Sequence, residues 1–70
     1  MTISEKIRLL ARRRGLTITA LAGKIEMTRQ NLNVKLRNNN FTTAELQKIA
    51  VVLNCTFDTV FTMNDTGEKI

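Results

Sequence analysis

Apolar residues recur along most of the chain at intervals of three and four, in four separate stretches. In chain order these positions are Ile3, Ile7, Leu10 and Ala11; Ile18, Leu21, Ala22 and Ile25; Leu32 and Leu36; and Leu46, Ile49, Ala50 and Leu53. This spacing places the apolar residues of each stretch on one face of a helix. Helices this short are stabilised mainly by packing against one another. The pattern therefore predicts a mainly α protein, a compact bundle of four helices around one core.

Threonines mark the starts of the predicted helices. They are Thr2, Thr17, Thr28 and Thr42, and their hydroxyls can accept hydrogen bonds from free N–H groups of the first turn. Thr2 and Thr42 are each followed three residues later by a glutamate, Glu5 and Glu45, which is the pattern of a capping box. The first helix is expected to run to about Arg14, because Gly15 suits the left-handed residue that commonly ends a helix.

The last part of the chain, from about residue 56 to residue 70, changes its pattern. Residues 55–63 alternate with a period of two and are rich in threonine, valine and phenylalanine, which favour strands. The turn residues 64–67 follow, and residues 68–70 could return as a second strand. We expect a short C-terminal strand or hairpin. The alternative is a fifth helix capped by Thr56, with Phe57, Val60 and Phe61 against the core.

A strand at the end of a helical domain would leave an open edge, which natural proteins usually cover. The same segment from a second subunit would cover it by two-fold symmetry, satisfying both copies at once. We therefore expect a homodimer, in which residues 56–70 serve as the dimerisation tail of a single domain spanning residues 1–70.

The composition restricts the functions that the chain can have. It contains eleven lysines and arginines and six acidic residues, which give a net charge of +5 and a pI near 10.2 and suit a polyanionic partner. With one cysteine, Cys55, and no histidine, the chain can form neither an internal disulfide nor an ordinary zinc site. Cys55 is expected to be a small buried apolar residue. Because no acid–base pair, nucleophile dyad or phosphate loop can be found, an enzyme is not expected, nor any cofactor or small-molecule ligand.

No apolar run approaches the length of a membrane span, so no membrane contact is expected. The first residues include Glu5, Lys6 and Arg8, which does not fit a secretory signal. A cytoplasmic location is the resulting expectation.

The second and third helices are separated only by the break at residues 26–28, which is typical of a helix-turn-helix. The expected third helix, from about Thr28 to Asn38, carries long polar side chains away from Leu32 and Leu36. They are Arg29, Gln30, Asn31, Asn33 and Arg37, with Asn38 at the end. Amide and guanidinium groups pair bidentately with base edges in the major groove of double-stranded DNA. We therefore interpret the third helix as a recognition helix.

From Ile3 to about Leu53 the sequence resembles the phage-repressor and Cro-like helix-turn-helix family of bacterial and phage transcription regulators. The likeness rests on Arg-Gly-Leu-Thr at residues 14–17, Leu-Ala at residues 21–22 and Met-Thr-Arg-Gln at residues 27–30, in this order between capped helices. It implies a bundle of four or five helices that binds operator DNA, commonly as a dimer and most often as a repressor. In this family the third helix enters the major groove while the second lies across the backbone.

Matched to the family position by position, Arg29 and Gln30 occupy the first base-reading positions of the third helix, and Asn33 and Val34 occupy further groove-facing ones. Val34 would then contact a thymine methyl group; the alternative is an ordinary surface valine. The candidates for phosphate contacts are Thr19, Thr28 and Arg37.

Two positions depart from the family pattern. Ile18 stands where the family often has a glutamine that touches the DNA backbone, and Glu26 stands where the turn often has glycine. A positive φ is uncommon for a residue other than glycine, so we expect either mild strain at Glu26 or a turn of different shape. The basic run Arg12-Arg13-Arg14 has two interpretations, either a favourable charge at the end of the first helix or contact with phosphates. The alternative function for the whole chain is a protein-interaction module on the same scaffold, such as an antitoxin or an anti-regulator.

Overall fold

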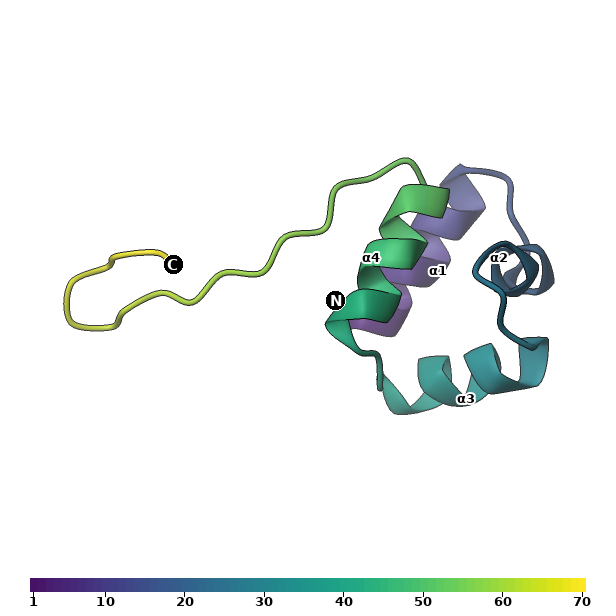
Figure 1. Cartoon of the computed structure of the whole chain (residues 1–70), viewed down its shortest axis with the longest axis horizontal. Coiled ribbons are helices and arrows are strands. Elements are labelled where there is room, and N and C mark those ends of the chain that lie inside the picture. Colours follow the sequence, from purple (N-terminus) through teal and green to yellow (C-terminus); the bar gives the residue numbers. More distant parts are fainter.

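The four predicted helices all form in the computed structural model, which describes residues 1–70. Their bounds are α1 Ile3–Arg13, α2 Ile18–Lys24, α3 Arg29–Asn38 and α4 Thr43–Val52. In the view of Figure 1, α4 lies in front of α1, α2 is seen nearly end-on, and α3 lies below the other helices. None of the helices combines the length and the apolar character that crossing a bilayer requires.

Each helix begins where its threonine predicts. In α4 the Thr42 hydroxyl accepts a hydrogen bond from the Glu45 N–H at 3.1 Å, and the Glu45 carboxylate accepts one from the Thr42 N–H at 2.8 Å. Thr2 and Glu5 form the same reciprocal pair at the start of α1. Thr17 and Thr28 accept single bonds from the third residue beyond them, at 3.0 and 3.1 Å. All four predicted caps are confirmed.

The two capping glutamates are held in their charged form. The Thr42 N–H lowers the pKa of Glu45, and the Lys35 ammonium group lowers it further. The Thr2 backbone N–H, followed by the Thr2 hydroxyl, lowers the pKa of Glu5. A hydrogen bond donated to a carboxylate favours its ionised form.

The helices end at residues with left-handed backbone. Gly15 follows α1 with a φ of 69°, and Asn39 and Asn54 follow α3 and α4 with φ of 49° and 54°. Glycine and asparagine tolerate this conformation. Glu26, between α2 and α3, has a φ of 59°, so of the two alternatives for this turn the strained one is found. This conformation is unfavourable for glutamate by roughly 1–2 kcal/mol, so the turn is kept by the packing on either side of it.

One core joins all four helices. Leu21 and Leu32 are fully shielded from solvent, at 0% exposure. The buried cluster consists of Ile7, Ala11, Leu21, Ala22, Ile25, Leu32, Leu36, Ile49 and Leu53. These are the positions that the periodicity selected, and Ile3, Leu10 and Leu46 pack half-buried around them. We call residues 1–54 the body.

Residues 55–70 form an arm that leaves the body at the end of α4 (Figure 1). The arm has no β-strand and no fifth helix, so the predicted strand or hairpin is not seen. Its backbone extends and then turns at Gly67, where a single isolated antiparallel bridge joins Thr62 to Lys69. Alternating β-branched and aromatic residues favour extended backbone, but a ladder also needs a neighbour to pair with. In one copy of the chain the arm has no such neighbour beyond its own turn.

Candidate nucleic-acid interface

The turn between α2 and α3 fixes how these helices meet. Ile25 ends α2, its side chain enters the core, and Glu26 takes the left-handed conformation. The Met27 N–H then donates to the Ala22 carbonyl at 2.9 Å, which closes the turn. Thr28 caps α3 directly afterwards. The result is a helix-turn-helix without glycine in its turn.

The buried residues Leu32 and Leu36 set the orientation of α3. At roughly 100° per residue, Val34 lies opposite the direction between these two leucines. Its side chain is 43% exposed, as the helical wheel requires. Gln30 and Arg37 flank Val34 on one side and Asn31 and Asn38 on the other, and all four are exposed. The outward face of α3 is therefore a strip of three amides and one guanidinium group, with the two methyl groups of Val34 at its centre.

The remaining predicted site residues lie around this strip. Arg29 is exposed at the first residue of α3, and Thr28 is exposed just before it, with its hydroxyl engaged in the cap. Asn33 is half-buried, so it lies at the edge of the outward face. Thr19 is exposed on α2. The structure thus gathers eight of the nine predicted residues on α3 and its cap, and leaves Thr19 on the neighbouring helix.

Two cations, Lys35 on α3 and Arg14 at the end of α1, are engaged within the body. The Lys35 ammonium group on α3 pairs with the Glu45 carboxylate on α4 at 3.0 Å. Arg14 donates from Nε to the Leu53 carbonyl at 2.8 Å and also contacts the Asn54 carbonyl. Arg14 therefore caps the end of α4, a role that neither interpretation of the arginine run included. Arg12 and Arg13 are exposed.

The α3 helix is also anchored at its far end by residues that sequence reasoning missed. Ser4, the one buried polar residue, donates its hydroxyl to the Leu36 carbonyl. The Ser4 N–H donates to the Asn39 side chain at 3.1 Å. These bonds satisfy groups at the end of α3 and tie it to the start of α1. The two hydrogen bonds of Ser4 join residues more than thirty positions apart, so no local sequence pattern predicts them.

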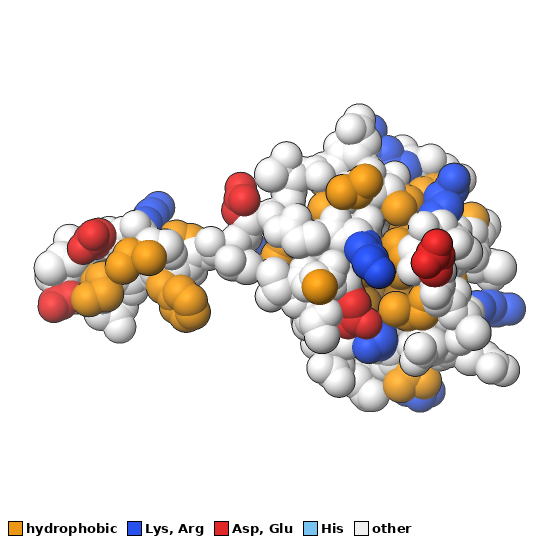
Figure 2. All heavy atoms as spheres, viewed as in Figure 1, with side chains coloured by type: hydrophobic (Ala, Val, Ile, Leu, Met, Phe, Trp, Pro, Cys, Tyr) orange, Lys and Arg blue, Asp and Glu red, His pale blue; other side chains and the backbone are white.

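Basic and acidic residues are distributed unequally between the body and the arm. The body has ten lysines and arginines against three glutamates, whereas the arm has only Lys69 against Asp58, Asp65 and Glu68. Figure 2 shows acidic and apolar side chains together on the arm, and most of the basic ones on the body. The positive charge therefore lies on the part of the molecule that contains the helix-turn-helix.

Comparison with known proteins gives one match. The family model described as Cro/C1-type HTH DNA-binding domain matches residues 6–66, which include all four helices except the first residues of α1. No curated protein and no solved structure matches the chain. No group of three histidine, cysteine or acidic side chains is placed to hold a metal ion.

Proposed function

Because the chain belongs to the Cro/C1-type HTH DNA-binding domains, which bind DNA and are not enzymes, we propose that it is a sequence-specific transcriptional regulator. It inserts α3 into the major groove of its operator and acts as a repressor by occupying the site. The observation that carries this proposal is the outward face of α3. There the side chains suited to base edges are exposed together, on a helix whose opposite face is locked in the core.

The roles of the side chains follow from their places on α3. Gln30 and Asn33 offer amides for bidentate pairing with adenine, and Arg29 offers a guanidinium group for guanine. Val34, in the centre of the strip, meets a thymine methyl. Thr19, Thr28, Arg37 and Asn38, around the strip, contact phosphates or sugars and set the register of the protein on the duplex.

We further propose that the regulator works as a homodimer joined through residues 56–70. A two-fold dimer presents two copies of α3 to one face of DNA, about 34 Å apart, and reads two half-sites. The support is the outer part of the arm, where Val60, Phe61 and Ile70 are exposed in one copy. Dimerisation would also multiply a modest affinity for each half-site into a high affinity for the whole operator.

Selection of bound sequences from random duplex DNA tests the function. The expected result is a two-fold-related motif with half-sites about one helical turn apart. Arg37→Ala should then weaken binding to all sequences alike and reduce the salt dependence of binding by about one unit of slope. A selection that returns no motif, together with saturable capture of a protein partner, would instead identify an interaction module.

A further inference from the structure

The start of α1 and the end of α3 are joined by two hydrogen bonds from Ser4. The Ser4 hydroxyl donates to the Leu36 carbonyl, and the Ser4 N–H donates to the side-chain oxygen of Asn39 at 3.1 Å. Ser4 is 6% exposed, so both bonds lie in the interior of the body. They satisfy an N–H of the first turn of α1 and a carbonyl of the last turn of α3, groups that helices leave without partners at their ends. We call Ser4, Leu36 and Asn39 the joint.

The side chain of Asn39 makes a contact that its backbone position does not require. Asn39 follows α3 with a φ of 49°, and Gly15 and Asn54 take the same left-handed conformation after α1 and α4. Glycine is the usual residue at such a position, because it adopts this conformation without strain. Of the two asparagines, only Asn39 uses its side chain in a hydrogen bond. The Asn39 amide therefore serves the contact with α1, and not the end of the helix alone.

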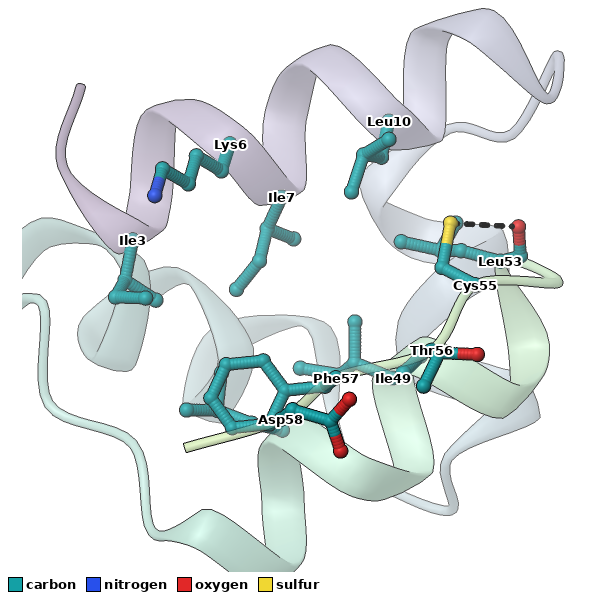
Figure 3. A pocket seen from close by; sticks show the side chains of 12 residues that line it. Ile3, Lys6, Ile7, Leu10, Ile49, Leu53, Cys55, Thr56, Phe57 and Asp58 are labelled. Carbon is teal, nitrogen blue, oxygen red and sulfur yellow. Dashed lines mark hydrogen bonds between the residues drawn. The ribbon is translucent and has the colours of Figure 1, made fainter. Parts of the chain in front are cut away.

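The start of α1 is a rigid support for this contact. Figure 3 shows the side chains of Ile3 and Ile7 directed from α1 toward α4, where Ile49 faces them. Ile7 and Ile49 are both buried in the core. The Thr2 hydroxyl also accepts a hydrogen bond from the first turn of α1. Ser4 lies in this same turn, so its position is fixed by the packing of α1 on α4.

The last turn of α3 is held from a second side as well. The Lys35 ammonium group pairs with the Glu45 carboxylate at 3.0 Å, and Glu45 is itself fixed in the capping box of α4. Arg37 and Asn38 belong to the same turn of α3, and both are exposed. The inward residues of this turn are thus tied to α1 and α4, whereas the outward ones face solvent.

We propose that Ser4 and Asn39 are positioning residues for DNA recognition. They hold the last turn of α3, so that Arg37 and Asn38 meet the DNA backbone in one fixed register. This inference rests on the proposed function. A last turn that frays would have to be ordered again on binding, which lowers affinity. The loss applies to the operator, where backbone contacts set the register of the protein. It applies much less to random duplex DNA, which a basic domain binds through charge alone.

The first test measures the joint without DNA. Asn39→Gly removes the side-chain contact and keeps the backbone unstrained, because glycine tolerates a positive φ. Asn54→Gly is the matched control, since it makes the same substitution at a φ of 54° where the side chain has no hydrogen bond. Amide hydrogen exchange in the last turn of α3 should be about 3- to 10-fold faster in Asn39→Gly, as expected for one lost hydrogen bond. Asn54→Gly should leave it unchanged. Equal exchange of this turn in the two variants would overturn the proposal.

The second test measures DNA binding at a temperature where every variant is fully folded. The probes are the duplex that the parent selects from random sequences and a duplex of random sequence. Asn39→Gly and Ser4→Ala should lower the ratio of the two affinities by about 3- to 10-fold, and Asn54→Gly should keep the parent's ratio.

A role in stability alone would change both affinities by the same factor. An unchanged ratio in Asn39→Gly and Ser4→Ala would therefore overturn the positioning role while leaving the proposed function intact. A parent that selects no preferred duplex would overturn the proposed function itself, so the two failures are distinct.

Discussion

The body and the arm use similar apolar side chains with opposite results. In the body, leucines and isoleucines at helical spacing meet in one core, and Leu21, Leu32 and Leu53 are almost fully buried. In the arm, Phe61 and Ile70 remain exposed although they pair with each other. The difference lies in what surrounds these side chains. Each helix packs against other helices of the same chain, whereas the outer part of the arm lies away from the body (Figure 1). The apolar side chains of the body are thus buried within one copy, whereas those at the end of the arm are exposed.

The largest expected difference is between the stability lost on substitution in the core and the stability lost on substitution in the arm. Leu32→Ala should lower the free energy of unfolding by about 2–5 kcal/mol, because it opens a cavity in a site that is closed to solvent. Phe61→Ala should change it by less than about 0.5 kcal/mol when the protein is dilute enough to be monomeric. Denaturant titrations of both variants at low concentration provide the measurement. Similar losses in the two variants would mean that the arm belongs to the core of a single copy.

A smaller effect is expected from the cap of α4. Thr42→Ala should destabilise the body by about 0.5–2 kcal/mol, because the Glu45 N–H loses its partner. The neighbouring Thr43 is the matched control, since it is exposed and caps nothing. The measurement is the urea concentration at which each variant is half unfolded. If Thr42→Ala and Thr43→Ala unfold alike, the capping box does not contribute to stability.

The smallest predicted effect is on the stability of the fold at acidic pH. The lowered pKa of Glu45 means that its charged form stabilises the fold above the ordinary value of 4.5, and that this contribution is lost as the pH falls through the lowered pKa. Glu45→Gln should therefore be less stable than the parent at pH 6, with the difference shrinking as the pH falls below 4.5. Thermal unfolding at a series of pH values provides the test, and a constant difference for Glu45→Gln would contradict it.

The sequence predicted the body well because its signals are local. A threonine and a glutamate three residues apart, as at Thr42 and Glu45, can satisfy each other without help from the rest of the chain. The turn at Glu26 was likewise foreseen from the break between two apolar periods. The bonds from Ser4 to the end of α3 and from Arg14 to the end of α4 were not foreseen, because they depend on how distant helices meet.

The arm could not be predicted in the same way. The alternation of residues 55–63 predicted a strand or hairpin, which is not seen, because a strand needs a neighbour to pair with and the arm contains only one isolated bridge, between Thr62 and Lys69. For the candidate site, the wheel set by Leu32 and Leu36 placed Gln30, Val34 and Arg37 outward, and these side chains are exposed. Which bases these side chains contact depends on the sequence of the operator, and the protein sequence does not contain that information.

The most direct test of the account is the site preference of Gln30→Ala, compared with the parent by selection from random duplexes. Gln47→Ala is the control, because it removes the same amide from an exposed position on α4 rather than α3. The account predicts that Gln30→Ala loses about 1–3 kcal/mol on the parent's preferred site and no longer discriminates at one base position of each half-site, while Gln47→Ala keeps the parent's preference. An unchanged preference in Gln30→Ala would contradict the claim that the outward face of α3 reads the operator.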